Sequence, residues 1–267
     1  MNDAANANGR SGPQLRRILV IDPSAATAKM LAELLRSIVP NCHVYGAQTE
    51  ERALGFLESF DPQLIFVEYK GPQLDGLEFT KRLRRSYLAC REVPVIVITA
   101  EATAAAILGA RDAGVHEFLR RPFTLGDLKK RMDAIMLRPR DWVEAVSYVG
   151  PDRRRFNSAD YKGPRKRRSE GSSGLAQKVG QSIKIVQSAA NAIATDPKQA
   201  YRALKAQAQL LSELSAGREP LKRLEAVALS MASYLSGPAA TDGLSKEQIE
   251  IFAAQLLAAA PEEAKAA

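Results

Sequence analysis

The stretch QLIFVEY, residues 63–69, decides how the first half of the chain folds. It is short and apolar almost throughout, as expected of a strand that is buried on both faces of a sheet. Four other short runs share this character: ILVI at 18–21, HVYGA at 43–47, PVIVITA at 94–100 and HEFLRR at 116–121. Between the runs, apolar residues recur at helical spacing. Because such strands and helices alternate, the sequence predicts a doubly wound α/β domain of five units over residues 16–137.

Polar residues stand where these strands end. Asp22 follows the first strand, Glu68 ends the third, Thr99 ends the fourth and Arg121 ends the fifth. In sheets of this kind, ligands bind beyond the carboxyl ends of the strands. These four residues are therefore the candidate site residues of the domain.

This constellation, with Asp75-Gly76 after the third strand and Pro122-Phe123 after the fifth, resembles the receiver domain of bacterial two-component response regulators. The resemblance runs through all five units and implies a flavodoxin-like (βα)5 fold. It also implies that an Asp ending the third strand accepts a phosphoryl group, while an acidic pair after the first strand helps to hold Mg²⁺. A Thr and a Lys would contact the phosphoryl oxygens, and an aromatic residue of the fifth strand would report the switch. Thr99 and Phe118 match the Thr and the aromatic residue.

The sequence departs from this pattern at three positions. Glu68 stands at the acceptor position, and its extra methylene would move the carboxylate by about 1.5 Å. Pro23 follows Asp22, so one metal-binding carboxylate is missing, and Mg²⁺ is not expected because it demands near-ideal oxygen geometry. Arg121 replaces the mobile Lys with a planar fork. The departures predict a pseudo-receiver in which Glu68 and Asp22 pair with Arg121.

The consequence of such an ion pair stays open at this point. It could mimic an active state, lock an inactive one, or only hold the fold together. Phosphorylation on Glu68 is the alternative hypothesis. In each case the expected role is regulatory, acting through protein partners in bacterial signalling.

An arginine-rich motif occurs twice in the sequence after this domain. Tyr148-x-Gly150-Pro151-x-Arg153-Arg154-Arg155 recurs as Tyr161-x-Gly163-Pro164-x-Lys166-Arg167-Arg168. Residues 138–168 contain 10 Lys/Arg and 4 Asp/Glu, so they carry +6 of the formal net charge of +8. Gly-Pro pairs favour turns, and the sequence predicts a basic linker over residues 138–174.

Arginine binds phosphate oxygens with a planar fork and, like an aromatic ring, stacks on bases. The doubled motif therefore suits a ligand with two phosphates and two bases, and it resembles the arginine-rich tails of CheY-like proteins that bind cyclic di-GMP. A solvated linker without a ligand is an equal alternative, and nucleic-acid binding ranks behind both. The nucleotide-binding candidates are Tyr148, Arg153, Arg154, Arg155, Tyr161, Arg165, Lys166, Arg167 and Arg168.

Residues 175–260 are rich in alanine and show helical periodicity. One apolar seam runs through Val179, Ile183, Val186, Ala190 and Ile193 at 4-3-4-3 spacing. Further signals are an N-cap at 196 followed by proline, a stop at Gly217 and a capping box from 245 to 248. The sequence predicts an all-α module of four short helices, either as a small bundle or as hairpins that complete their core in a homodimer.

Several classes of protein find no support in the sequence. His43 and His116 are the only histidines, and Cys42 and Cys90 are isolated, so neither type forms a metal or catalytic set. We find no nucleophile motif and no phosphate-binding loop, and therefore expect no enzyme. No run is long enough to span a membrane, and residues 1–15 lack the apolar core of a signal peptide. We expect a disordered tail there and a cytoplasmic protein.

Overall fold

The computed structural model describes residues 15–101, 103–153, 172–237 and 243–265, which fall into two compact units. The first contains the described residues up to Trp142 and those from Gly150 to Arg153; the second contains Val143–Val149 and the described residues from 172 onward. The expected tail 1–15 lies outside the described residues except for Leu15, which is buried in a core of the first unit. No helix among the described residues is both long and apolar enough to cross a bilayer.

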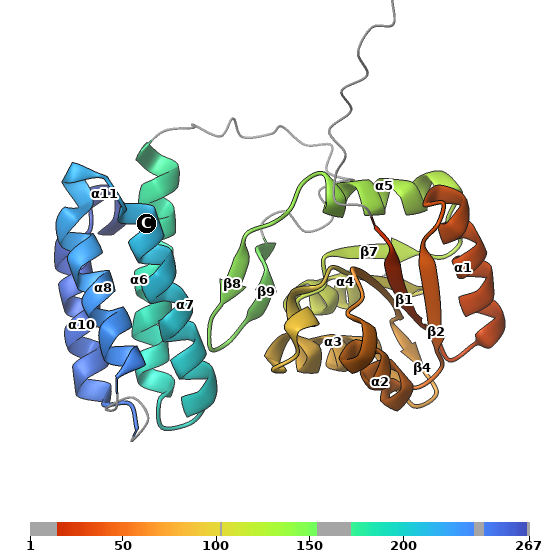
Figure 1. Cartoon of the computed structure of the whole chain (residues 1–267), viewed down its shortest axis with the longest axis horizontal. Helices are drawn as coiled ribbons and strands as arrows, with labels where there is room; N and C mark the ends of the chain where they lie inside the picture. Colours follow the sequence, from red (N-terminus) through yellow and green to blue (C-terminus); the bar gives the residue numbers. More distant parts are fainter. Residues whose placement is uncertain (1–14, 102, 154–171, 238–242, 266–267) are drawn as a thin grey trace, which may run out of the picture. The chain divides into compact units, whose positions relative to one another are not determined.

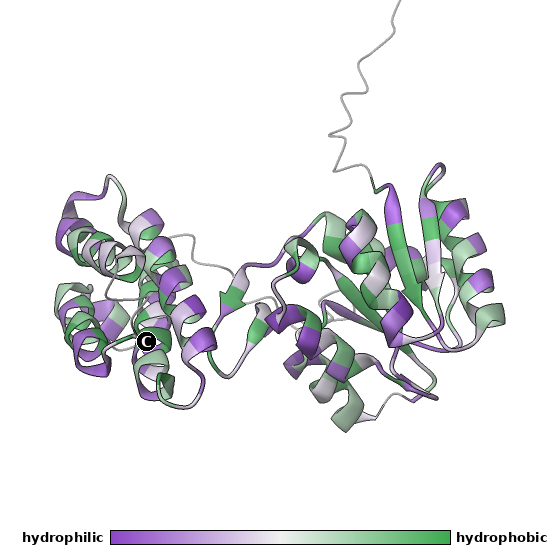
Figure 2. Cartoon of the chain, turned by 60° about the horizontal axis from the view of Figure 1, so that its bottom comes forward, coloured by the Kyte–Doolittle hydropathy of each residue, from purple (hydrophilic) through white to green (hydrophobic). Residues whose placement is uncertain are grey.

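The first unit is built on a five-stranded parallel sheet with the order β2-β1-β3-β6-β7. Figure 1 shows helices on both sides of this sheet, and Figure 2 shows its strands as predominantly hydrophobic. The prediction of a doubly wound α/β domain is confirmed. The strands are β1 (Arg17–Ile21), β2 (His43–Ala47), β3 (Leu64–Glu68), β6 (Val95–Thr99) and β7 (Glu117–Arg120).

Alternate side chains of the strands feed two separate cores. On β3, Ile65 and Val67 face the core shared with α2, α3 and α4, whereas Leu64 and Phe66 face the core shared with α1 and α5. A strand that is apolar on both faces requires such double coverage. The helices are α1 (Ala25–Ile38), α2 (Glu50–Phe60), α3 (Gly76–Arg85), α4 (Ala104–Asp112) and α5 (Leu125–Met136).

Each of these five helices begins on a side chain that accepts a hydrogen bond from the first turn. Such caps each stabilise a helix by about 1 kcal/mol and fix the point at which a strand hands over to a helix. They therefore order the loops at the carboxyl edge of the sheet, where the candidate site lies. The capping residues are Ser24, Thr49, Asp75, Thr103 and Thr124.

The described part of the expected linker is a hairpin rather than an irregular segment. Strands β8 (Trp142–Glu144) and β9 (Val149–Pro151) form a two-stranded sheet. The Gly150-Pro151 pair therefore lies in a strand, which corrects the prediction of a turn there. Proline is tolerated because both strands of a two-stranded sheet are edge strands. Arg154 and Arg155, which end the first copy of the repeat, and the whole second copy at 161–168 lie outside the described residues.

The second unit is a helical bundle around one hydrophobic core, as predicted. Asp196 caps the helix that begins at Pro197, and Ser245 caps a later one by accepting from the Gln248 N–H. The Ser245 N–H, however, donates to the Tyr234 hydroxyl, so the reciprocal half of the predicted capping box is replaced by a contact between helices. The elements are α6 (Ser172–Ala192), α7 (Pro197–Ser215), the 3-10 turn η3 (Glu219–Leu221), α8 (Lys222–Ser236), α10 (Lys246–Ala259) and α11 (Glu262–Lys265).

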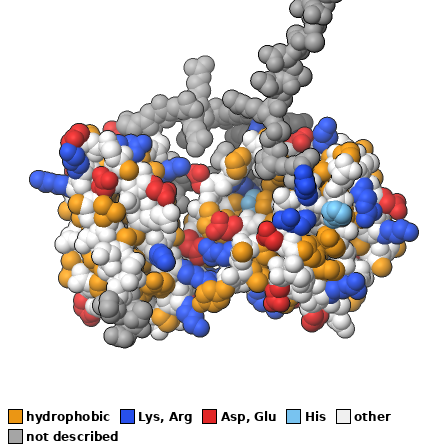
Figure 3. Space-filling model, viewed as in Figure 1, with side chains coloured by type: hydrophobic (Ala, Val, Ile, Leu, Met, Phe, Trp, Pro, Cys, Tyr) orange, Lys and Arg blue, Asp and Glu red, His pale blue; other side chains and the backbone are white. Residues whose placement is uncertain are grey.

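Charged side chains of both signs are interspersed over the face seen in Figure 3. No large field of one sign among the described residues is visible in that view. The described surface in this view therefore offers no broad cationic platform of the kind that binds nucleic acid.

Candidate functional site

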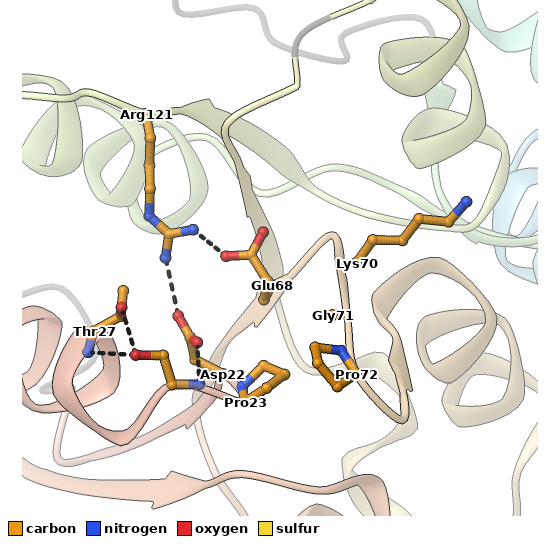
Figure 4. A pocket seen from close by; sticks show the side chains of 9 residues that line it. Asp22, Pro23, Thr27, Glu68, Lys70, Gly71, Pro72 and Arg121 are labelled. Atoms are coloured by element: carbon orange, nitrogen blue, oxygen red, sulfur yellow. Dashed lines mark hydrogen bonds and ion pairs between the residues drawn. The ribbon is translucent and has the colours of Figure 1, made fainter.

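The guanidinium of Arg121 bridges two carboxylates at the carboxyl edge of the sheet. One terminal nitrogen donates to Asp22 Oδ2 at 3.0 Å and the other donates to Glu68 Oε2. Figure 4 shows the three side chains converging from three different segments, after β1, at the end of β3 and after β7. The ion pairs expected from the sequence are therefore present.

The remaining carboxylate oxygens also have protein donors. Asp22 Oδ1 accepts from the Ser24 N–H at 2.8 Å, and Glu68 Oε1 accepts from the Tyr69 N–H at 3.2 Å. Each of the four carboxylate oxygens thus accepts a hydrogen bond from within the domain. The Nε of Arg121 is buried and has no partner among the described residues. A ligand that needs these carboxylates must therefore displace existing bonds.

Burial sets the electrostatics of this cluster. The side chains of Asp22 and Glu68 are 7% and 13% exposed, and that of Arg121 is 25% exposed. Burial raises the pKa of Glu68 above its ordinary value, and the neighbouring charge of Asp22 raises it further, while Arg121 acts in the opposite direction. Two carboxylates share one guanidinium, and the charge of Arg121 does not fully offset the effect of burial on Glu68.

Pro23 fills the side of the pocket where the resemblance calls for a second acidic residue. Its ring packs against Gly71, where an added Cβ would lie 2.6 Å from Pro23 Cγ. Gly71 belongs to a short antiparallel pair, β4 (Lys70–Gly71) with β5 (Leu74–Asp75), which shapes the loop between β3 and α3. Close packing of a proline ring on this loop leaves the pocket with carboxylates from Asp22 and Glu68 alone.

The first residue of α3, Gly76, packs closely against the backbone of Glu68. A Cβ on Gly76 would lie 2.2 Å from the Glu68 carbonyl oxygen, so only glycine fits there. Asp75 then caps α3 by accepting from the Leu77 and Glu78 N–H groups. The backbone around Glu68 is thus held on both sides, by β6 and by the α3 start.

A cavity of about 410 Å³ opens beside the cluster. Figure 4 shows that the Lys70 side chain extends away from Arg121 and Glu68, so its ammonium does not join the ion pairs. The cavity is therefore lined by apolar and hydroxyl groups next to a charge cluster that is already internally paired. Its lining residues are Asp22, Pro23, Ser24, Thr27, Glu68, Lys70, Gly71, Pro72 and Arg121.

The two expected switch residues are both buried. Thr99 ends β6, and its hydroxyl oxygen accepts from the Glu101 N–H at 2.9 Å. The Phe118 ring lies in the core shared with α2, α3 and α4, where it is 3% exposed. The Thr99 hydroxyl thus serves the loop that follows its own strand, and a switching role for either residue stays a prediction.

Of the nucleotide-binding candidates, the structure describes only Tyr148 and Arg153, and their exposure differs. Tyr148 is 5% exposed, which corrects the expectation that its ring stacks on a ligand. Arg153 is exposed and pairs with Asp112 at the end of α4, at 2.9 Å. The other candidates lie outside the described residues: Arg154, Arg155, Tyr161, Arg165, Lys166, Arg167 and Arg168.

Sequence reasoning missed a cluster around the only tryptophan. The Trp142 ring lies 5.3 Å from the Arg84 guanidinium and 5.9 Å from that of Arg91. Arg84 is buried and donates to backbone carbonyls as well as lying 3.3 Å from His116 Nδ1. Arg140 donates to the His116 carbonyl oxygen. A lone tryptophan within a basic segment was the available signal, because an indole face attracts guanidinium groups.

Comparisons with known proteins agree with this geometry. Residues 18–133 match the family model for the response regulator receiver domain. The chain is 31% identical over 119 residues to the cyclic di-GMP phosphodiesterase response regulator RpfG of Xanthomonas campestris pv. campestris, a match that covers 45% of this chain and 31% of RpfG. It is 30% identical to the Arabidopsis thaliana two-component response regulator ARR5, covering 51% of this chain and 79% of ARR5.

The chemotaxis protein CheY-3 of Vibrio cholerae is also 30% identical, over 122 residues that cover 46% of this chain and 92% of CheY-3. Among solved structures, a two-component response regulator from Clostridium difficile matches with a TM-score of 0.42 and 26% identity, over 46% of this chain and 97% of that one. Of RpfG, the first of these relatives, the chain spans less than a third.

Proposed function

The chain belongs to the response regulator family, and on that premise we propose that its first unit is a pseudo-receiver whose pocket is closed by an internal ion pair. The unit acts as a non-enzymatic signalling module through protein partners in the cytoplasm. The observation that carries this proposal is the bridge from Arg121 to both Asp22 and Glu68. In this proposal the Arg121 guanidinium pairs with Asp22 and Glu68, which stand at positions that contribute to the metal-binding site of a receiver.

The pocket does not fit Mg²⁺. Mg²⁺ needs near-octahedral oxygen ligands at about 2.0–2.1 Å. The only carboxylates lining the cavity are those of Asp22 and Glu68, and all four of their oxygens accept bonds from protein donors. Binding would place a divalent cation beside the Arg121 guanidinium, and like charges at that separation repel.

The alternative, phosphorylation on Glu68, requires a carboxylate oxygen that can attack a phosphoryl group. Glu68 Oε2 accepts from Arg121, and Oε1 accepts at 3.2 Å from the Tyr69 N–H, which also donates to the Ile98 carbonyl oxygen at 2.8 Å. Breaking the Arg121 contact in a site where the Glu68 side chain is 13% exposed would leave a poorly solvated charge. The closed pocket therefore favours a receiver that holds one state without a phosphoryl group.

A second proposal concerns the arginine-rich segment. We propose that it binds cyclic di-GMP, supported by the doubled basic motif and by the exposed guanidinium of Arg153. Bidentate arginine–phosphate contacts would supply the recognition. RpfG is named as a cyclic di-GMP phosphodiesterase response regulator, and that name describes RpfG alone. A nucleic acid as ligand is the competing outcome, recognisable by a steep loss of affinity with salt.

The helical unit is proposed as the output module, with homodimer formation through its helices. The observation in favour is that α10 exposes two large apolar side chains, Ile251 at 49% and Leu257 at 38%. Light scattering on wild type and on an Ile251→Lys variant tests this point, and a monomeric wild type would remove it.

The pseudo-receiver proposal is tested with a phosphodonor. Wild type and a Pro23→Asp/Glu68→Asp/Arg121→Lys variant are incubated with radiolabelled acetyl phosphate and Mg²⁺. We expect no label on wild type and detectable label on the variant, which restores the family's residues. Mg²⁺-dependent labelling of wild type, lost in Glu68→Gln, would overturn the proposal.

Cyclic di-GMP binding is tested by calorimetry on wild type and on an Arg153→Ala/Arg154→Ala/Arg167→Ala/Arg168→Ala variant. Saturable heat from wild type and none from the variant is the expected pair of results. No binding by wild type at micromolar ligand would remove the idea.

A further inference from the structure

The second unit contains a segment of chain that is not helical. Residues Val143–Val149, the tip of the β8–β9 hairpin, belong to this unit by their contacts. Ala145, Tyr148 and Val149 are buried, and Val146 packs against the hydrophobic core of the helices. The segment therefore lies on the bundle in the manner of a bound peptide.

Two buried glutamines of α7 form hydrogen bonds with this segment. Gln199 Nε2 donates to the Glu144 carboxylate at 2.8 Å and to the Ala145 carbonyl oxygen at 3.2 Å. Gln207 Nε2 donates to the Glu144 carbonyl oxygen at 3.1 Å. Both glutamines are 3% exposed; their bonds to backbone carbonyls recognise the main chain, and the bond from Gln199 to the carboxylate selects a glutamate at this place.

The site is not fully satisfied by its present occupant. Gln207 Oε1 is buried without a hydrogen-bond partner among the described residues. A buried acceptor of this kind costs about 1–3 kcal/mol when it stays unpaired. A bound segment with a backbone N–H at this oxygen would satisfy it.

The occupant is also weakly held by its own structure. Among the described residues, its strand pairing lies within one two-stranded hairpin, and an isolated hairpin is marginally stable in water. At the tip, where residues 146–147 bend, the Ala145 N–H donates to the Tyr148 carbonyl oxygen at 2.9 Å. Docking of Val143–Val149 therefore depends on the contacts with the helices.

We propose that the α7 face around Gln199 and Gln207 is a binding site for an extended acidic peptide, filled in cis by the detachable segment Val143–Val149. The partner it fits is a short extended segment of another protein, with a glutamate at the place of Glu144 followed by small apolar residues. Such a segment would pair its glutamate with Gln199 and its main chain with Gln207. The cis segment then acts as a built-in competitor of that partner.

The first test uses a fluorescently labelled peptide of residues 143–151 and the full-length protein. A Val146→Asp/Tyr148→Asp variant places charge in the apolar contacts of the cis segment and so vacates the site. We expect saturable binding of the peptide to this variant, at least tenfold tighter than to wild type. Adding Gln199→Leu/Gln207→Leu should weaken that binding at least tenfold, whereas Gln209→Leu, on an exposed position of α7, should leave it unchanged. Equal affinity of wild type and the vacated variant would overturn the proposal.

A second measurement covers the case in which the vacated variant loses its helical circular dichroism. Excess unlabelled peptide is added to wild type, and hydrogen exchange is followed at the Ala145 amide and in the core of α7. Displacement predicts at least tenfold faster exchange at Ala145 with no change in α7. Unaltered exchange at Ala145 under saturating peptide would show that the segment is a fixed part of the bundle, contrary to the proposal.

Discussion

Arg121, in the loop after β7, forms an ion pair with Glu68, the last residue of β3. Strand β6 lies between these two strands in the sheet, so the ion pair crosses its carboxyl end. Asp22, after β1, holds the other terminal nitrogen of the same guanidinium. The pair therefore ties together three segments that are far apart in the sequence. It does so where the receiver fold otherwise gathers groups for phosphoryl transfer.

Removing the guanidinium should leave two poorly solvated carboxylates facing each other. Arg121→Ala is expected to lower the free energy of unfolding at pH 7 by about 2–4 kcal/mol. This loss is smaller than that for breaking a fully buried ion pair, because solvent partly screens the Arg121 side chain. Urea denaturation measures the change. Arg120→Ala, one residue earlier and exposed, is the matched control. An Arg121→Ala protein as stable as its control would contradict a structural role for the pair.

Glu68 should make stability depend on pH in a defined direction. Its pKa in the folded protein is raised, so between about pH 4.5 and that pKa the folded state holds a proton that the unfolded state has lost. This contribution is fully present below the unfolded pKa and is lost as pH rises through the folded pKa. The stability of wild type relative to Glu68→Gln should therefore fall with rising pH across this window and then level off. A difference that rises with pH instead would show that the pKa of Glu68 is lowered.

His116 should produce the opposite slope. Burial, with Arg84 and Arg140 nearby, holds its pKa well below the ordinary value, so the folded state keeps the ring neutral. Below about pH 6.5 the unfolded chain takes up a proton that the folded chain does not. Stability is then lost by up to about 1.4 kcal/mol for each pH unit as pH falls. His116→Asn should flatten this slope between pH 6.5 and 5, whereas His43→Asn, on the exposed start of β2, serves as the control.

Pro23 and Gly71 should be energetically coupled. A methyl group on residue 71 would meet Pro23 Cγ at 2.6 Å, so Gly71→Ala is expected to cost about 1–3 kcal/mol of stability. Pro23→Ala removes the ring, and the double variant should recover most of that loss. A double-mutant cycle measures the coupling. Additive effects of the two substitutions would argue against the packing of Pro23 on this loop.

The sequence was sufficient for features that depend on local pattern. The five strands and the helices between them follow from apolar runs that alternate with helical spacing. The convergence of Asp22, Glu68 and Arg121 follows because the carboxyl ends of parallel strands meet at one edge. The apolar seam through Val179 and Ile183 is buried, because a helix of that pattern needs a core.

Features that depend on long-range contacts were beyond the sequence. The hairpin in residues 142–151 was predicted as turns, because Gly150-Pro151 is a strong turn signal. Strands β8 and β9 have three residues each, which is too short for an alternating pattern to be recognised in the sequence. Tyr148 lies among arginines in the sequence but is buried. The bonds from Gln199 and Gln207 to Glu144 span more than 50 residues, and no local rule pairs them.

The proposal that the receiver pocket binds no Mg²⁺ is tested most directly by titrating Mg²⁺ into the protein in a calorimeter. The account predicts no binding heat from wild type, because Arg121 and two backbone donors hold all four oxygens of Asp22 and Glu68. The Pro23→Asp/Glu68→Asp/Arg121→Lys variant should bind, since it gains a carboxylate and loses the bridging fork. Saturable Mg²⁺ binding by wild type that disappears in Asp22→Asn would contradict the account.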